Sequence, residues 1–185
     1  MRNILLAATV ALAPFFMTGQ ASALTISTDG TWYQADEFHA PGSFFATTWD
    51  FTCSDSCTLD VSDWAVISDL FEVFDNALSI GLTSIVPSWD TLGCAGAFDP
   101  ACFTTDPDAA WADARFSKAS FILAAGVHTI SILTTFIPPT SVGGGPFGDS
   151  TVQLRVNEVP LPATFGFLAA GLVGLGVLGR RRKTV

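Results

Sequence analysis

Two apolar segments without acidic residues stand at the ends of the chain, and they limit the part that can fold as a globular domain. The first covers residues 4–17, follows Arg2, and is succeeded by the small residues Ala21-Ser22-Ala23. A positive start, a short apolar run and an A-x-A sequence are typical of a secretory signal peptide. We therefore predict that residues 1–23 are a signal peptide read by the export machinery and signal peptidase, and that the mature chain begins at Leu24.

The second apolar segment, residues 161–179, precedes the basic cluster Arg180-Arg181-Arg182-Lys183. As a helix it would extend about 28 Å at about 1.5 Å per residue, close to the thickness of a hydrocarbon core. Cations are retained on the cytoplasmic side of a membrane. We therefore expect one transmembrane helix with its C-terminus inside and residues 24–158 outside the cytoplasm. The alternative for this end is a plain membrane anchor that is never cleaved.

The sequence Val159-Pro160-Leu161-Pro162-Ala163 lies at the start of this end of the chain. A Pro-x-Pro element, one terminal span and a basic tail together resemble the PEP-CTERM sorting signals of bacterial exosortase substrates, in the VPLPA variant. The resemblance implies that an exosortase-type enzyme cleaves near the motif and sends the domain to the cell surface or exopolysaccharide. The two prolines of the motif are consistent with cleavage there, because prolines disfavour a helix and leave an extended segment that a protease can bind as a strand. Residues 159–185 are thus expected to form a C-terminal sorting signal.

The charge of the interior argues against a nucleic-acid partner. Of the eight Lys and Arg residues, five lie at the two ends of the chain. The other three, Arg115, Lys118 and Arg155, stand against all 17 Asp and Glu residues. Binding to phosphates requires clustered Lys and Arg. We therefore expect residues 24–158 to contact neither nucleic acid nor anionic lipid.

Short segments rich in Phe, Val, Ile, Thr and Trp, separated by turn residues, fill the interior, whereas helical periodicity is weak. We expect strands over residues 43–51, 58–68, 70–74, 77–83, 116–124, 127–136 and 151–156. Hairpin turns are expected at Asp75-Asn76 and Ala125-Gly126. In the last strand the alternation places Val152, Leu154 and Val156 on a core face. The pattern predicts an all-β fold, namely an antiparallel β-sandwich of jelly-roll-like form, over residues 24–158.

Four cysteines lie in the interior, where an exported chain keeps disulfides. They allow three pairings. We favour Cys53 with Cys57 and Cys94 with Cys102, because each pair closes a short loop within one segment. The alternative is a zinc site of four thiolates, but the spacing departs from paired C-x2-C knuckles and no His lies nearby.

Residues 84–113 carry no strand signal and exceed the usual connection of about 4–6 residues, so the segment is expected to be functional or tied down. Asp106, Asp108 and Asp113 could hold calcium there, because carboxylates on a flexible loop are its usual ligands. Trp111 could stack on the face of a sugar ring. The segment lacks the residue order of an EF-hand, and solvated loop carboxylates are the simpler interpretation.

No catalytic constellation stands out in the sequence. His39 and His128 are far apart, and His128 shares strand parity with apolar neighbours, so a hydrogen-bonded histidine at the core edge is the simpler interpretation. Glu37 and Glu72 could serve a glycosidase, but no spacing singles out a carboxylate pair. We therefore expect no enzyme, no catalytic residue and no cofactor.

The resulting hypothesis is an exported protein of structural or adhesive role at the cell surface or in the exopolysaccharide matrix. Its expected partners are the sorting enzyme, the membrane through the C-terminal helix, and exopolysaccharide. The alternative is a secreted carbohydrate-active hydrolase that uses the loop carboxylates.

Overall fold

The structure is a computed structural model of the chain. It describes the β-strand domain together with parts of the long connection, residues 84–113. The described residues are 22–87, 91–92, 94, 99–137 and 148–159. The apolar segments 4–17 and 161–179, the motif after Val159 and the basic cluster lie outside them, so the signal peptide and the transmembrane helix stay predictions. Within the described residues, no helix has the length and apolarity needed to cross a membrane.

Strands dominate the described residues, and one short helix accompanies them. The elements are β1 (Ser22–Thr25), β2 (Tyr33–His39), β3 (Thr47–Cys53), β4 (Cys57–Asp63), β5 (Ala65–Val66), β6 (Leu70–Asp75), β7 (Leu78–Leu82), β8 (Phe103–Thr104), α1 (Pro107–Ala112), β9 (Lys118–Leu123), β10 (Gly126–Phe136) and β11 (Gly148–Glu158).

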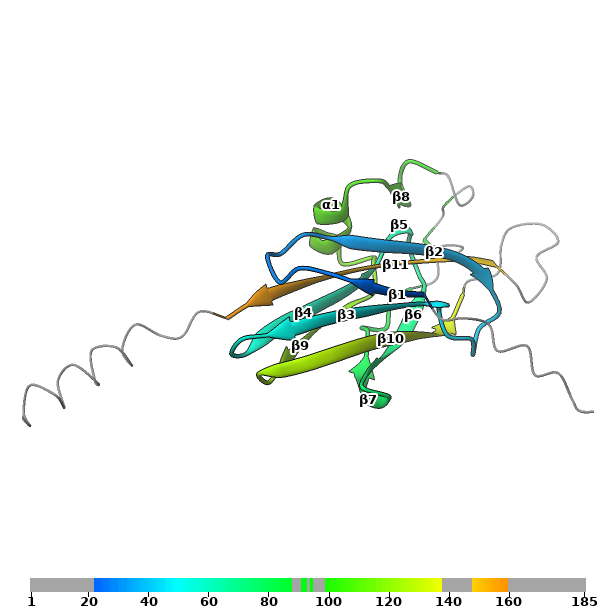
Figure 1. The fold of residues 1–185 in the computed structure, drawn as a ribbon. Coiled ribbons are helices and arrows are strands. Elements are labelled where there is room, and N and C mark those ends of the chain that lie inside the picture. Colours follow the sequence, from blue (N-terminus) through cyan, green and yellow to red (C-terminus); the bar gives the residue numbers. More distant parts are fainter. Residues whose placement is uncertain (1–21, 88–90, 93, 95–98, 138–147, 160–185) are drawn as a thin grey trace, which may run out of the picture.

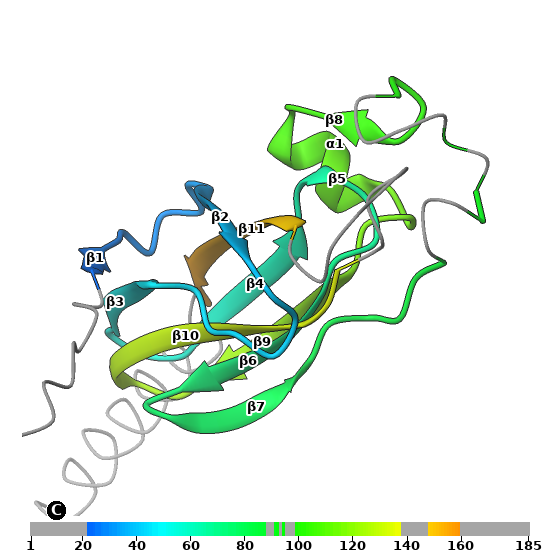
Figure 2. The ribbon, with the colours of Figure 1, turned by 90° about the vertical axis from the view of Figure 1, so that its right-hand side faces the viewer.

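Two larger sheets pack face to face. The five-stranded sheet has the order β1-β3-β10-β6-β7, and the four-stranded sheet has the order β2-β11-β4-β9. All pairs in them are antiparallel except β1 with β3. Figures 1 and 2 show the two layers, with α1 and the small sheet β5-β8 beside the four-stranded sheet on its outer side. The all-β prediction is confirmed.

The core lies between the two sheets and follows from alternation along the strands. Val152, Leu154 and Val156 are fully buried, as the pattern of the last strand predicted. They pack in one cluster with Trp49 and Phe71 from the opposite sheet. Because β-strands expose alternate residues on opposite faces, the residues between these positions point away from the core.

The elements differ from the sequence prediction in several places. The expected hairpin at Ala125-Gly126 is instead a connection between the two sheets, because β9 belongs to the four-stranded sheet and β10 to the five-stranded one. The turn between β6 and β7 is Asn76-Ala77, one residue later than expected, and both residues have positive φ. The expected strand over 58–68 ends at Asp63, because Ala65 adopts a positive φ of 63° and the chain turns away. Strand β2 was not predicted, since its sequence YQADEFH mixes charged and apolar residues.

The predicted cleavage point for signal peptidase falls inside β1. This strand pairs in parallel with β3, Leu24 opposite Trp49 and Thr25 opposite Asp50. All of its residues are exposed. Cleavage before Leu24 would therefore leave two of the four register pairs in place and would remove no core residue.

Candidate functional site

A row of polar side chains crosses the outer face of the four-stranded sheet. Register places Ser120 of β9 opposite Asp60 of β4, and Asp60 opposite Arg155 of β11. The Asp60 carboxylate accepts a hydrogen bond from Ser120 Oγ at 2.6 Å and another from Arg155 Nε at 2.9 Å. Asp60 is buried, so this ion pair is shielded from water and fixes the direction of the arginine.

Two tryptophan rings flank the guanidinium of Arg155. Its Cζ lies 4.4 Å from the centroid of the Trp32 ring and 5.6 Å from the centroid of the Trp111 ring. The two ring centroids are 5.7 Å apart, with 51° between the ring planes. Asp108 contacts both Trp32 and Arg155. Its Oδ1 accepts a hydrogen bond from Trp32 Nε1 at 2.9 Å and lies 3.5 Å from Arg155 Nη1. We call Trp32, Trp111, Arg155, Asp108 and Asp60 the aromatic cluster.

Helix α1 owes its start to Asp106. The side chain of Asp106 accepts bonds from the backbone N–H groups of Asp108 and Ala109, and Pro107 takes the first helical position. An aspartate cap followed by proline is a favoured way to begin a helix. The cap therefore positions Asp108 and Trp111 on the same short helix.

The helix is bound to the outer face of the sheet by a second row of side chains. Gln153 Nε2 donates to the Pro107 carbonyl at 2.9 Å. Lys118 Nζ donates to the Asp113 carbonyl at 3.0 Å and to the carbonyl of Trp111. These bonds hold Trp111 against the sheet next to Arg155.

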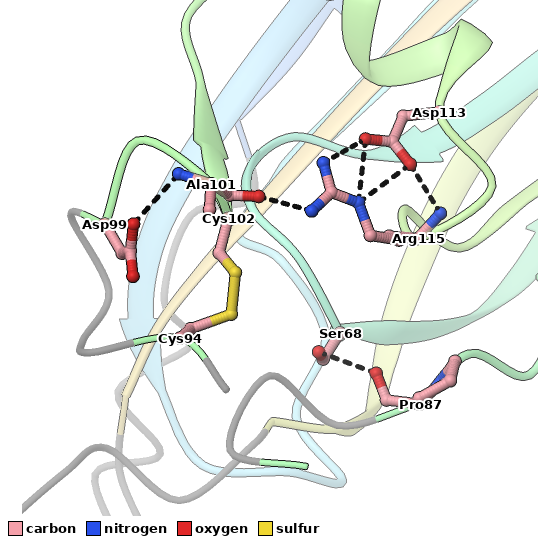
Figure 3. The surroundings of a disulfide bond; sticks show 8 residues. All are labelled: Ser68, Pro87, Cys94, Asp99, Ala101, Cys102, Asp113 and Arg115. Atoms are coloured by element: carbon pink, nitrogen blue, oxygen red, sulfur yellow. Dashed lines mark hydrogen bonds and ion pairs between the residues drawn. A yellow bond between two sulfur atoms is a disulfide. The ribbon is translucent and has the colours of Figure 1, made fainter. Parts of the chain in front are cut away.

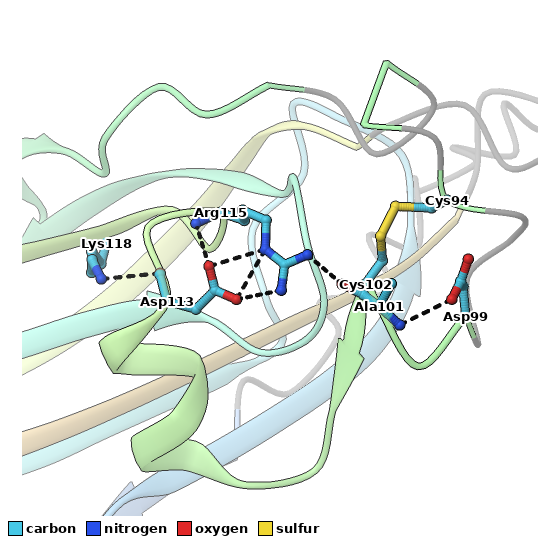
Figure 4. Close-up of polar contacts among 7 residues, drawn as sticks. All are labelled: Cys94, Asp99, Ala101, Cys102, Asp113, Arg115 and Lys118. Atoms are coloured by element: carbon cyan, nitrogen blue, oxygen red, sulfur yellow. Dashed lines mark hydrogen bonds and ion pairs between the residues drawn. A yellow bond between two sulfur atoms is a disulfide. The ribbon is translucent and has the colours of Figure 1, made fainter.

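The segment around the helix is tied down by an ion pair and a disulfide (Figures 3 and 4). Arg115 Nη2 lies 2.6 Å from Asp113 Oδ2, and Arg115 Nη1 donates to the Ala101 carbonyl. Hydrogen bonds from Arg115 lower the pKa of the Asp113 carboxyl. Cys102, next to Ala101, is bonded to Cys94. The hydrogen bond from Arg115 to Ala101 and the disulfide therefore tie the end of the long connection to its middle.

The three aspartates that the sequence offered as calcium ligands have separate tasks. Asp106 caps α1, Asp108 contacts Trp32 and Arg155, and Asp113 pairs with Arg115. Over the described ranges, no three side chains of His, Cys, Asp or Glu are placed to hold a metal ion together. The structure thus brings Asp108 and Trp111 into one site and places Asp106 and Asp113 in structural roles.

Both predicted disulfides are present. Cys53 and Cys57 have Cα atoms 5.8 Å apart, and those of Cys94 and Cys102 are 6.1 Å apart. Both distances suit a disulfide. Because all four cysteines are bonded, none offers a thiolate for a zinc site.

A buried carboxyl pair, Asp63 and Asp69, was missed by the sequence reasoning. Asp63 Oδ2 accepts from the backbone N–H of Asp69 at 3.1 Å, and Asp69 Oδ2 accepts from that of Thr151 at 3.3 Å. Burial raises the pKa of Asp69 to about 7, and burial together with the charge of Asp69 raises that of Asp63 well above its usual range. Both carboxyls are buried, so they lie out of reach of a ligand in solvent.

The histidine and glutamate candidates have structural partners. His128 bonds to Asp75 at 2.9 Å and to the Ala124 carbonyl at 3.0 Å, as expected of a histidine at the core edge. Glu37 accepts two backbone N–H bonds, and Glu72 accepts a bond from a serine hydroxyl. The side chain of His39 lies outside the described part of the chain.

Trp32, Asp60 and Arg155 are the site residues that sequence reasoning did not find. The alternation of the last strand already implies that Arg155 points away from the core, since Leu154 and Val156 point into it. That signal marks a lone outward cation, but it does not identify its partners, because Asp60 and Trp32 lie far away in the sequence.

No protein-family model and no curated protein match this chain. The solved structures similar to this chain include two that each match 74% of it and nearly all of their own length. They are the pre-peptidase C-terminal domain of a Bacillus anthracis collagenase (10% identity, TM-score 0.36, 93% of that chain) and PliG, a periplasmic inhibitor of g-type lysozyme from Aeromonas hydrophila (12%, 0.37, 95% of that chain). A GH87 alpha-1,3-glucanase catalytic domain is similar over 68% of this chain and 22% of its own length (14%, 0.28). Similarities this weak carry no argument about function.

Proposed function

We propose that the protein is an exported, disulfide-bonded β-sandwich of jelly-roll-like form that has a structural or adhesive role at the cell surface or in the exopolysaccharide matrix. In this proposal residues 1–23 direct export. The segment 161–179 holds the chain in the membrane until an exosortase-type enzyme cleaves at the motif Val159–Ala163. The proposal therefore treats the folded domain as cargo between two removable signals.

The observation that carries the proposal is the place where the last described strand ends relative to the motif. The last strand, β11, ends at Glu158, and the backbone N–H of Val159 donates to the Ser56 carbonyl at 2.9 Å. The core residues of this strand, such as Val156, all precede that point. Cleavage within or after the motif would therefore remove none of the described core residues and would leave both described sheets whole.

The disulfides support the same proposal. Cys53 and Cys57 close the loop that joins β3 of one sheet to β4 of the other, and Cys94 and Cys102 close the loop before α1. Disulfides persist in oxidising compartments outside the cytoplasm and are rare within it. Two bonded pairs with no free cysteine fit an exported domain.

The test is the intact mass of the protein from surface, medium and membrane fractions of its native cell, measured with and without reductant. We expect a surface or medium form that begins at Leu24, ends within residues 159–163 and gains four hydrogens on reduction. A mass that retains the span and Arg180-Arg181-Arg182-Lys183 in every fraction would overturn the processing claim and leave a plain anchored domain.

The alternative, a carbohydrate-active hydrolase, requires two carboxyls roughly 5–10 Å apart that face the substrate. Three described carboxyls have a raised pKa: Asp63 and Asp69 are buried, and Asp36 is exposed, its pKa being raised by partial burial and by the charge of Asp149. No described observation favours the hydrolase over a binding or structural role. Assaying the purified protein for release of reducing ends from the cell's own polysaccharide separates the two.

A further inference from the structure

We propose that the aromatic cluster on the outer face of the four-stranded sheet binds a neutral saccharide chain, with Trp32 and Trp111 as the stacking rings and Asp108 and Arg155 as the polar contacts. The inference names the ligand of the adhesive role proposed above and rests on that role. It does not depend on how the C-terminus is processed.

The two indole rings provide the apolar contact. Sugar rings carry C–H groups on their faces, and large, rigid aromatic side chains bury such surface at low entropic cost. Trp32 and Trp111 remain partly exposed although their centroids are only 5.7 Å apart. Both rings are already oriented, Trp32 by its bond to Asp108 and Trp111 by helix α1, so little ordering is needed when a ligand binds.

The carboxylate of Asp108 provides the polar contact. Its side chain is 77% exposed, and Oδ1 carries its bonds to Trp32 and Arg155. In the described residues Oδ2 has no hydrogen-bond partner, so it can accept bonds from sugar hydroxyls. The guanidinium of Arg155 donates to Asp60 through Nε and can donate to a hydroxyl through the part of it that is exposed.

The charges of the site favour a neutral ligand over an anionic one. Arg155 is paired with two carboxylates, Asp60 and Asp108, which leaves this group of three with a net negative charge. The other nearby cation, Lys118, keeps its charge while it donates to two backbone carbonyls, and its Nζ lies 5.7 Å from the centroid of the Trp111 ring. With Lys118 included, two cations balance two carboxylates, so an acidic polysaccharide gains no net attraction at the site and meets repulsion from the exposed Asp108.

Helix α1 covers only part of the outer face and leaves room for a chain of sugars. It is bound over the row that contains Gln153 and Lys118. Beyond the row of Arg155, register aligns Asn157, Thr58 and Ile122 across three strands, and Ile122 is 83% exposed. Asn157 lies against Gly30, so a saccharide stacked on Trp111 and Trp32 can continue over this row at its other end, past Thr58 towards Ile122.

The test uses mature protein from the native cell with its disulfides intact. Binding of the neutral and acidic fractions of the cell's own exopolysaccharide is measured by calorimetry and tryptophan fluorescence, with polygalacturonate as a defined acidic probe. We expect binding to the neutral fraction only, and loss of about tenfold or more in affinity for Trp111→Ala and for Trp32→Ala.

Matched variants separate a binding role from a structural one. Trp111→Phe keeps a stacking ring and should bind within about threefold of the wild type, a difference of about 0.7 kcal/mol. Phe44→Ala removes a ring that is 51% exposed and packs on Phe74 of the other sheet, and should leave affinity unchanged. Melting curves and intact masses confirm that each variant is folded and oxidised.

Two outcomes would overturn the inference. One is a folded wild-type protein that binds neither polysaccharide fraction or binds only the acidic one. The other is neutral binding that survives both alanine substitutions in the folded variants. Either result leaves the processing claim intact, because the mass measurement tests that claim separately.

Discussion

The two faces of the four-stranded sheet belong to the same strands and yet have opposite chemistry. On the inner face, Val61 and Leu154 are fully buried in the core. On the outer face, one residue away along each strand, Asp60 and Arg155 form an ion pair, and the guanidinium lies over the Trp32 ring. Period-two alternation thus lets one sheet provide both the core and a polar site. Substitutions on the two faces should therefore have separable effects.

The largest effect is expected on the inner face. Leu154→Ala should lower the free energy of unfolding by about 4 kcal/mol, because it leaves a cavity in a closely packed core. Urea denaturation measures this change. The control Ile122→Ala, at a side chain that is 83% exposed on the outer face, should change it by about 0.5 kcal/mol or less. Equal effects of the two substitutions would contradict the division between the faces.

The inner face has one exception at its end, where the buried pair Asp63 and Asp69 makes stability depend on pH. Their pKa values are raised in the folded state, that of Asp69 to about 7, so the stabilisation is present below about pH 4 and is lost as the pH rises through 7. The wild type should lose on the order of 4 kcal/mol relative to Asp69→Asn over this range.

Urea denaturation from pH 4 to pH 8 measures the free energy of unfolding of the wild type and of Asp69→Asn. Asp55→Asn, at an exposed carboxyl in the β3–β4 loop, serves as the control and should follow the wild-type curve. A pH dependence of Asp69→Asn equal to that of the wild type would show that the buried pair does not titrate in this range.

The third effect concerns the link between the sheets. The double variant Cys53→Ala/Cys57→Ala should lower the free energy of unfolding by about 2 kcal/mol, as chain entropy predicts for a short closed loop. It should also speed hydrogen exchange at the Val159 amide, which is bonded to Ser56 inside that loop. Unchanged exchange at Val159 would show that the strand end is held without the disulfide.

The smallest effect is expected on the outer face. Asp106→Ala removes the cap of α1 and should destabilise the helix by about 1 kcal/mol. Faster exchange at the amides of Asp108 and Ala109, which the cap binds, measures the change. Saccharide affinity should fall while urea unfolding of the sandwich stays near that of the control Thr105→Ala. A large loss of global stability would mean that α1 is part of the core fold.

Several elements of the fold were predictable because their signals are local. The alternation over residues 151–156 identified the core face of β11, and the short spacings of Cys53/Cys57 and Cys94/Cys102 identified both disulfides. Helix α1 was missed, because six residues are too few to show helical periodicity, although the Asp106-Pro107 cap was visible.

Only part of the aromatic cluster was predictable from the sequence. Asp108 and Trp111 stood out as an acid and a ring in a long connection, but the segment offered Asp106 and Asp113 with equal weight. Only the fold showed that Asp108 contacts Trp32, 76 positions away, and that Arg155 pairs with Asp60, 95 positions away.

The sequence by itself determined the all-β class, the inward and outward parity of β11 and the cysteine pairing, because each depends on residues that are neighbours along the chain. Tertiary structure alone decided which outward residues meet, since strand order places β11 between β2 and β4 and so brings Trp32 and Asp60 to the two sides of Arg155. It also decided that Asp63 and Asp69 are buried next to each other, because the turn at Ala65 folds the chain back between them. Contacts between distant segments depend on the packing of whole sheets, and no local pattern encodes them.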